Sequence, residues 1–277
     1  HAWFKQRRTP GALDIKPGCF MGRMIAVANQ KGGVGKTTTS INLSACLAEK
    51  GKKVLLVDMD SQGNTTSGLG LEKNELEKTI YEVLREEISV EDAIVEIEDC
   101  FGNLFLIPSN RNLAGAEIEL ITSENMQYIL KEKLALIKDQ YDYIILDCPP
   151  ALGMLTVNAM TASDSVLVPI QCEFYALDGL SQLIYTINLI QENLNPSLEI
   201  EGVVFTMYDA RTNLSLQVVE NVKDNLNQNI YKTIIPRNVR LAEAPSHGLP
   251  INLYDKKSSG AEAYHLLADE VIENTEK

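Results

Sequence analysis

Hydrophobic residues along this chain follow two alternating patterns. Short apolar runs of strand length alternate with longer segments in which apolar residues recur at helical spacing. Continuous apolar runs are typical of parallel strands that are buried on both faces, and the segments between them are typical of the helices that cover such a sheet. The pattern therefore predicts an α/β fold: a single-domain, doubly wound, mostly parallel sheet with helices on both faces.

The predicted elements cover the chain from residue 24 almost to its end. Strands are predicted at Met24–Asn29, Lys53–Asp58, Leu104–Pro108, Tyr143–Asp147, Ser165–Pro169, Gly202–Met207 and Thr233–Pro236. Helices are predicted at Thr37–Lys50, Thr79–Arg85, Val90–Ile97, Ala114–Ile121, Met126–Lys138, Leu155–Ala162, Leu177–Leu194, Leu214–Leu226 and Ala261–Asn274. Because no internal repeat, low-complexity tract or linker interrupts this alternation, one domain over residues 21–277 is favoured over two.

The first twenty residues differ in composition from the rest. They contain four Lys and Arg residues against a single Asp, together with two Pro-Gly pairs. We interpret residues 1–20 as an irregular extension and a start-site artefact, since Met21 opens an apolar segment that suits a natural beginning. A basic arm that binds DNA is the alternative interpretation.

Composition places the chain among ordinary globular proteins. Its 277 residues are 45% hydrophobic and 23% charged, which excludes collagen-like, disordered and coiled-coil chains. The formal net charge is −13, so the molecule as a whole repels nucleic acid and anionic membranes. Binding to either therefore requires a local basic patch.

The cysteines and the apolar runs indicate the compartment. Five cysteines occur without a C-x-x-C pair, which fits neither a disulfide framework nor a zinc site. No apolar run is long enough to span a bilayer, and the N-terminus lacks the apolar region of a secretory signal. We therefore expect a cytoplasmic protein.

The strongest motif is a glycine-rich loop between a predicted strand and a predicted helix. It comprises Lys31, Gly32, Gly33, Val34, Gly35, Lys36, Thr37 and Thr38. Glycines let successive backbone N–H groups surround phosphate oxygens, and the following helix N-terminus adds partial positive charge. Lys36 is expected to contact the β- and γ-phosphates and the Thr37 hydroxyl to bind Mg²⁺, whereas the Val34 side chain packs. The loop therefore predicts binding of ATP with Mg²⁺.

The loop departs from the usual phosphate-binding pattern G-x-x-x-x-G-K-[ST] at its start. Gln30 occupies the first glycine position, and an additional lysine, Lys31, follows it. This deviant Walker A form resembles that of the P-loop NTPases related to nitrogenase iron protein. The resemblance implies that Lys31 reaches the partner's nucleotide across a sandwich homodimer.

Acidic residues end two of the predicted strands. Asp58 and Asp60 follow the second strand, and Asp147 ends a later one. Carboxyl ends of parallel strands lie beside the phosphate loop. We predict that Asp147 holds Mg²⁺, directly or through water. Asp58 or Asp60 could orient the attacking water, and we favour Asp60 because it opens a turn that can move; a strand-end cap or turn residue is the alternative for each carboxylate.

Four segments together resemble the ParA/Soj family of chromosome-partitioning ATPases over residues 21–277. They are Lys31–Thr38, Asp58–Asn64, Leu146–Pro150 and Pro236–Ser246. The resemblance implies an ATPase switch: ATP drives dimerisation, the dimer binds double-stranded DNA without sequence preference, and a ParB-like partner stimulates the hydrolysis that releases it. Nucleoid association is then expected. The chain departs from the family at Ser61, where proline is common, which leaves φ freer there.

The resemblance also assigns residues outside the phosphate loop. Pro236 and Asn238 match the segment that holds adenine, through either backbone or side chain. Arg211 and Arg240 match positions of DNA-contacting basic residues. A solvated charge or an ion pair within the domain is the alternative for both arginines. Four further basic residues could extend the patch, although the same alternative is favoured for them: Lys232, Arg237, Lys256 and Lys257.

Two other functions share the signature loop. A MinD-like membrane-surface ATPase would use a basic amphipathic C-terminal helix, but the predicted helix at Ala261–Asn274 is rich in acidic residues, so no stable membrane anchor is expected. An electron-transfer reductase would need cluster cysteines. Cys148 is instead interpreted as a buried cysteine at a strand end, and His247 as a loop residue without a ligand set.

Overall fold

A computed structural model describes four stretches of the chain: residues 22–119, 125–173, 176–226 and 228–276. The extension predicted for residues 1–20 lies outside them, so its interpretation stays a prediction.

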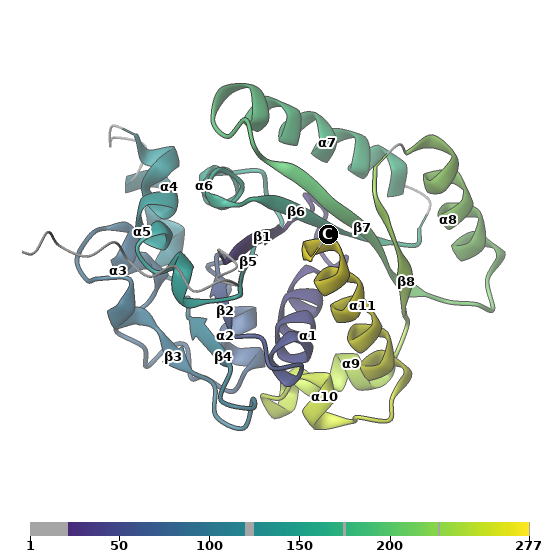
Figure 1. Ribbon diagram of the computed structural model, residues 1–277, viewed down its shortest axis with the longest axis horizontal. Helices are drawn as coiled ribbons and strands as arrows, with labels where there is room; N and C mark the ends of the chain where they lie inside the picture. Colours follow the sequence, from purple (N-terminus) through teal and green to yellow (C-terminus); the bar gives the residue numbers. More distant parts are fainter. Residues whose placement is uncertain (1–21, 120–124, 174–175, 227, 277) are drawn as a thin grey trace, which may run out of the picture.

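One mixed sheet forms the centre of the described fold. Its strands are β1 (Arg23–Val27), β2 (Val54–Asp58), β3 (Val95–Glu96), β4 (Leu104–Ile107), β5 (Tyr143–Asp147), β6 (Ser165–Gln171), β7 (Glu199–Tyr208) and β8 (Ile230–Pro236). They lie in the order β3-β4-β2-β5-β1-β6-β7-β8. Every neighbouring pair is parallel except β3 and β4. The predicted doubly wound, mostly parallel sheet is therefore confirmed (Figure 1).

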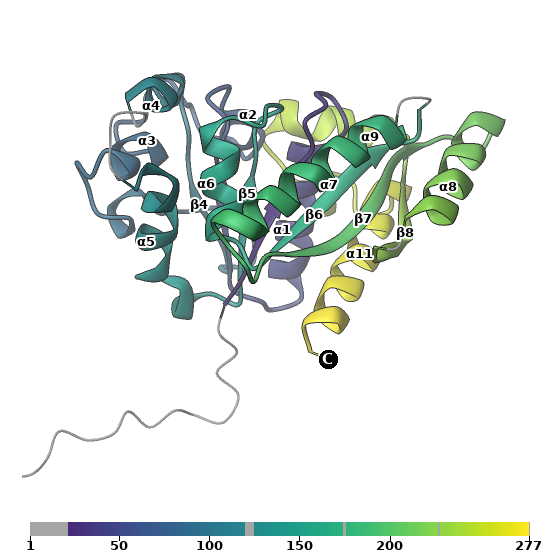
Figure 2. The same cartoon turned by 90° about the horizontal axis from the view of Figure 1, so that it is seen from above.

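Helices cover both faces of this sheet, as Figures 1 and 2 show. They are α1 (Lys36–Glu49), α2 (Asn64–Gly68), α3 (Ile80–Leu84), α4 (Leu113–Glu119), α5 (Ile129–Ala135), α6 (Met154–Ala162), α7 (Ala176–Asn193), α8 (Asn213–Asn225), α9 (Val239–Glu243), α10 (Ile251–Tyr254) and α11 (Ser259–Thr275). Within the described stretches, four short 3₁₀ turns accompany them: η1 (Glu91–Ala93), η3 (Met126–Tyr128), η4 (Lys138–Gln140) and η5 (Ala244–His247). α1 and α11 pack together on one face, whereas α5, α6, α7 and α8 pack in succession on the other.

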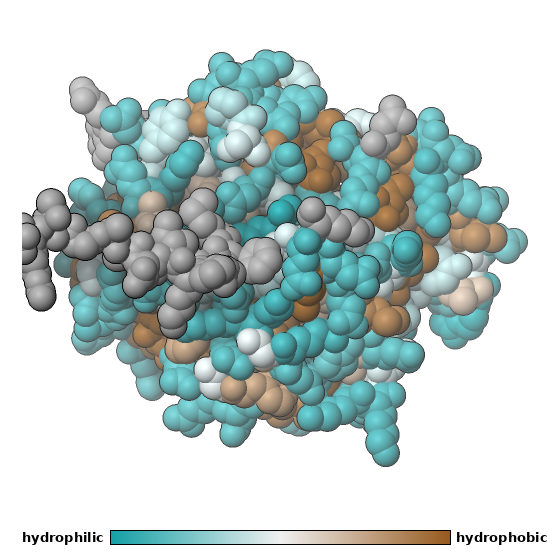
Figure 3. All heavy atoms as spheres, in the orientation of Figure 1, coloured by the Kyte–Doolittle hydropathy of each residue, from teal (hydrophilic) through white to brown (hydrophobic). Residues whose placement is uncertain are grey.

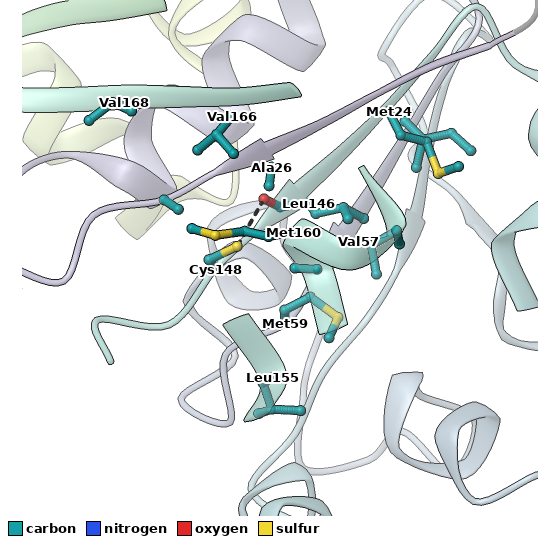
Figure 4. Packing of buried hydrophobic residues seen from close by; sticks show 14 of the residues in the cluster. Met24, Ala26, Val57, Met59, Leu146, Cys148, Leu155, Met160, Val166 and Val168 are labelled. Carbon is teal, nitrogen blue, oxygen red and sulfur yellow. Dashed lines mark hydrogen bonds between the residues drawn. The ribbon is translucent and has the colours of Figure 1, made fainter. Parts of the chain in front are cut away.

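The core is divided by the sheet into two apolar clusters. Successive strand residues point to opposite faces, so Met24 and Ala26 of β1 belong to one cluster and Ile25 and Val27 to the other. Figure 4 shows part of the first cluster. Burial on both faces explains why β1, β2 and β5 are apolar runs rather than alternating sequences. It also explains why the sequence pattern located these strands.

Two predicted helices are wrong in part. The segment Val90–Ile97 is not one helix, because the short turn η1 is followed by β3, which pairs antiparallel with β4. The edge of β4 offers unpaired backbone groups, and the extended residues Val95 and Glu96 pair with them. The helix predicted at Met126–Lys138 is interrupted, because η3, α5 and η4 divide it. These tighter turns bring the chain to the start of β5.

Most of the face seen in Figure 3 is covered by hydrophilic residues, and hydrophobic residues occupy small separate areas. No helix among the described residues combines the length and the apolar character needed to cross a membrane.

Candidate nucleotide site

The glycine-rich loop joins β1 to α1 and borders a cavity of about 340 Å³. Gly33 and Gly35 adopt φ of +76° and +89°, a left-handed conformation that favours glycine. The lining residues are Gly32, Gly33, Gly35, Lys36, Thr37, Thr38, Asp60, Asn64, Pro150 and Met207. The fold thus brings most of the predicted phosphate-binding residues together with Asp60. Two of the predicted residues, Lys31 and Val34, lie outside this lining.

Lys36 is buried at the base of the loop. Its Nζ donates to the carbonyl oxygen of Lys31 at 2.9 Å. Burial lowers the pKa of the Lys36 ammonium, and the nearby carboxylate of Asp147 opposes that shift. The charge is held against backbone oxygen inside the cavity, a position from which it can meet a phosphate.

Asp147 lies fully buried beside Thr37, behind the cavity lining. Its Oδ2 accepts hydroxyl hydrogens from Thr37 at 2.8 Å and Thr65 at 2.6 Å, and its Oδ1 accepts one from Ser40 at 2.9 Å. Burial raises the pKa of this carboxyl and the three hydroxyls oppose the shift. Mg²⁺ prefers hard oxygen donors and usually takes only one or two from the protein. The Thr37 hydroxyl and Asp147 carboxylate fit that requirement.

Asp58 and Asp60 occupy different environments, although only one residue separates them. Asp60 lines the cavity, and its Oδ1 accepts the backbone N–H of Gln62 at 2.9 Å. Asp58 does not line it. Its Oδ2 accepts both the hydroxyl and the N–H of Thr66, and burial raises its pKa to about 7. Of the two, Asp60 alone faces the space where phosphate would lie.

A second cavity, of about 210 Å³, adjoins the first. Gly35, Thr38 and Met207 line both cavities, and Pro236 and Asn238 line only the second. The Asn238 side chain caps α9: its Oδ1 accepts N–H groups from the first turn, and its Nδ2 donates to a serine hydroxyl. Because that side chain is engaged, its backbone is the more available contact for a base.

The motifs did not identify three residues of this site. Met207 lines both cavities and has φ of +51°, an unusual conformation for a bulky side chain. Its position as the last residue of a predicted strand, Gly202–Met207, gave no sign of this. Asn64 and Pro150 stood inside segments that the resemblance quoted, so the motif context was the signal that could have identified them.

Lys31 lies at the rim of the site, where its ammonium forms an ion pair with Glu173. Glu173 follows β6, so the pair joins the loop to the next strand of the sheet. Val34 is buried, and its carbonyl accepts the Thr206 hydroxyl at 2.8 Å. The Val34 side chain is therefore a packing group.

Both predicted DNA-contacting arginines are exposed and paired within the chain. Two nitrogens of Arg211 bond to the two carboxylate oxygens of Asp209, at 2.9 and 2.7 Å. Arg240 pairs with Glu243 at 2.9 Å and with Asp255 at 3.4 Å. Exposed pairs of this kind contribute little to stability, so neither pair prevents exchange for a phosphate.

Four further basic residues have varied surroundings: Lys232, Arg237, Lys256 and Lys257. Lys256 pairs with Glu49 at 3.7 Å and lies over the Phe101 ring. Arg237 lines the second cavity, and the Lys232 and Lys257 backbone N–H groups bond to carboxylates. Two of the four lie near the predicted DNA-contacting arginines: the charge of Arg237 helps to lower the pKa of Asp209, the partner of Arg211, and the Lys257 N–H bonds to Asp255, which also pairs with Arg240.

Two residues for which the sequence predicted no catalytic role, Cys148 and His247, have structural roles. Cys148 is buried among apolar side chains and donates to the Leu146 carbonyl (Figure 4). Burial raises the pKa of its thiol, so it is unreactive. The interpretation of His247 as a loop residue is wrong, because it ends η5 and stacks on the Tyr254 ring at 4.9 Å. The described residues contain no group of three or more His, Cys, Asp or Glu side chains arranged to hold a metal.

Known proteins resemble this chain along most of its length. A family described as an AAA domain matches residues 22–200. The sporulation initiation inhibitor protein Soj of Bacillus subtilis is 59% identical over 254 residues, covering 92% of this chain and all of that protein. The chromosome partitioning protein ParA of Myxococcus xanthus is 49% identical, covering 95% and 94%.

A solved structure supports the same fold. The cobyrinic acid a,c-diamide synthase of Mycobacterium smegmatis, crystallised with ADP and magnesium, is 38% identical, with a TM-score of 0.82 and coverage of 93% of this chain and 96% of that one. A shared fold does not fix the reaction, which depends on the site.

Proposed function

The chain belongs to the Soj/ParA family of chromosome-partitioning ATPases, and on that premise we propose that it is an ATP-driven DNA-partitioning switch. ATP binding favours a sandwich homodimer that binds double-stranded DNA, and hydrolysis, stimulated by a ParB-like partner, releases the DNA. The single observation that carries the proposal is the cavity that brings the glycine-rich loop, Lys36 and Asp60 together.

The two adjoining cavities support ATP as the nucleotide. The phosphates would lie in the cavity bordered by Gly32 to Thr38, and the base in the cavity bordered by Pro236 and the Asn238 backbone. Mg²⁺ would be held by the Thr37 hydroxyl and by Asp147, directly or through water. It would neutralise charge on the phosphates.

The charged residues of the site have different roles in the proposed hydrolysis. Lys36 binds the β- and γ-phosphates. Its electrostatic attraction to them strengthens as negative charge shifts between the two phosphates during hydrolysis. Asp60 orients the attacking water from the turn that follows β2. Lys31 contributes its charge to the partner's nucleotide, for which it must leave Glu173. Slow hydrolysis by a monomer is therefore expected.

DNA binding rests on Arg211 and Arg240. Each pairs with a carboxylate of the same chain, and exchange of that carboxylate for a DNA phosphate retains an ion pair. With a net charge of −13, one protomer has weak attraction for DNA. A dimer doubles the contacts, so affinity becomes useful only in the ATP state. We accordingly place the protein in the cytoplasm, associated with the nucleoid.

The test is retention on non-specific duplex DNA with ATP, ADP or no nucleotide, over a range of salt concentrations. Retention that needs ATP and falls steeply with salt is expected, because phosphate contacts release counterions. Asp60→Ala should prolong retention with ATP by slowing hydrolysis, whereas Arg211→Glu should weaken it for all sequences. An ATP-dependent dimer without DNA retention would contradict the proposal.

A MinD-like membrane switch is the second candidate, and the packing of α11 in the core argues against it. The buried side of α11 includes Ala261, Tyr264, Leu267 and Val271, which pack in the core beside α1 and β8. That apolar side is therefore occupied inside the domain, and the exposed side carries acidic residues. Sedimentation with anionic vesicles in the presence of ATP would favour this alternative.

A further inference from the structure

Two consecutive threonines of α2 are bound to the carboxylates that end β5 and β2. Thr65 donates its hydroxyl hydrogen to Asp147 Oδ2 at 2.6 Å, and Thr66 donates its own to Asp58 Oδ2 at 2.7 Å. Both threonines and both aspartates are buried. Since α2 directly follows the Asp60 turn, these two hydrogen bonds hold the short helix on which the position of the turn depends.

The surroundings of Asp147 distinguish the two hydrogen bonds. An ionised carboxylate has about four acceptor sites, two on each oxygen. On Asp147, Oδ2 accepts from Thr37 and Thr65, and Oδ1 accepts from Ser40. Both acceptor sites of Oδ2, the oxygen that Thr37 contacts, are therefore occupied. Any further donor that arrives on the Thr37 side must displace one of the two hydroxyls already there.

We propose that Thr65 is a positioning residue whose hydroxyl leaves Asp147 when Mg²⁺ is bound beside Thr37, which frees α2 and the Asp60 turn to move. This inference rests on the proposed function, because it needs Mg²⁺ at that site. Thr37 would stay in place as a ligand of Mg²⁺, and the acceptor site that Thr65 vacates on Asp147 Oδ2 would become available for holding the metal, directly or through water. Thr65 is the donor that leaves, because α2 has only five residues.

The hydrogen bond of Thr66 serves as an internal comparison. Asp58 does not line the cavity, and its Oδ2 accepts both the hydroxyl and the N–H of Thr66. Metal binding at Thr37 therefore leaves this bond intact. Asn64, the first residue of α2, lines the cavity together with Asp60. Movement of α2 thus changes the side chains that face the phosphates.

Hydrogen exchange over residues 64–71 measures this release directly. The amides of Ser67, Leu69 and Gly70 donate to carbonyls at the start of or within α2, so they report its opening. The full chain is compared with ADP and Mg²⁺ and with ADP and a chelator. ADP is used because the proposed function gives dimerisation to ATP, and dimer formation would itself protect residues near the site.

In the unaltered protein we expect these amides to exchange roughly ten-fold faster with Mg²⁺, since loss of a hydrogen bond to a charged group has an effect of at least that size. Thr65→Val should exchange fast under both conditions and lose the Mg²⁺ response. Thr65→Ser should restore the response. Thr66→Val, which loses the neighbouring hydroxyl, should raise exchange in both conditions but keep the Mg²⁺ response.

Calorimetric titration with ADP separates the two ways of failing. If ADP binds with Mg²⁺ but exchange in α2 of the unaltered protein does not change, the inference is overturned and the proposed function stands. A full Mg²⁺ response in Thr65→Val would also overturn it. If ADP does not bind at all, the proposed function fails and the inference fails with it. The comparison within the unaltered protein needs no substitution, so it holds even if a variant does not fold.

Discussion

Gly248→Ala tests the contact between the segment after α2 and the segment after α9. Gly248 directly follows η5 with φ of +66°, and a Cβ there would lie 2.7 Å from Cα of Gly70 and 3.0 Å from its nitrogen. Gly70 follows α2 and has φ of +83°. Two backbones therefore approach each other closely, and neither neighbour is a flexible side-chain end that could move aside.

The expected loss has two contributions. A left-handed conformation costs a non-glycine residue about 1–2 kcal/mol. Displacement of the Gly70 backbone adds about 1–3 kcal/mol, as overpacking does elsewhere. The control is Gly51→Ala, because Gly51 has φ of +81° but no atom within 4 Å of the Cβ position. We expect a loss of about 1–2 kcal/mol for the control and about 2–5 kcal/mol for Gly248→Ala.

The assay is urea denaturation followed by circular dichroism, with the free energy of unfolding extrapolated to water for each protein. Both variants replace glycine by alanine, so the gain from restricting the unfolded chain is the same in each and cancels in the comparison. Equal losses in the two variants would refute the reasoning, because they would show that the approach of Gly248 to Gly70 places no constraint on the fold.

Three further predictions concern single carboxylates. Asp209→Asn removes the partner of an exposed arginine and one negative charge, so DNA retention with ATP should persist to higher salt; release at lower salt would show that Asp209 positions the arginine instead. Glu173→Gln frees Lys31, so an ATP analogue should dimerise the protein at up to roughly five-fold lower concentration, and unchanged dimerisation by light scattering would contradict this. The pKa of Asp58 is raised to about 7, so its contribution to the free energy of unfolding is full below about pH 4 and is lost as the pH rises to about 7. This loss of stability is on the order of a few kcal/mol, and Asp58→Asn should remove most of it. An unchanged slope of the unfolding free energy against pH in that variant would contradict the prediction.

The sequence predicted the fold well where burial alone decides the pattern. Strands such as β1 and β5 are covered on both faces, so their apolar runs were clear. The pattern failed at β3, because a two-residue edge strand depends on the neighbouring β4 rather than on its own sequence. It also failed at Met126–Lys138, where helical spacing continues through tight turns that only the approach to β5 requires.

The site was predicted to different depths for a similar reason. Local motifs located the glycine-rich loop and Asp60, because strand, turn and helix are consecutive in the chain. Met207 was not found, because it reaches the cavities through its place in the sheet, far from the loop in sequence. Thr65 was not singled out either, since its hydroxyl acquires a role only through Asp147, more than eighty residues away.

Ion pairs within the chain hold the cations on which the proposed switch depends. The three cations proposed to contact another molecule, Lys31, Arg211 and Arg240, each pair with a carboxylate of the same protomer. Such exposed pairs contribute little to stability, so a phosphate that offers equal or greater charge can replace the carboxylate at little cost. Until then the carboxylates reduce the attraction of each cation for stray anions. ATP and DNA are both phosphate ligands, so the same exchange of a carboxylate for a phosphate would serve both the proposed dimerisation and the proposed DNA binding.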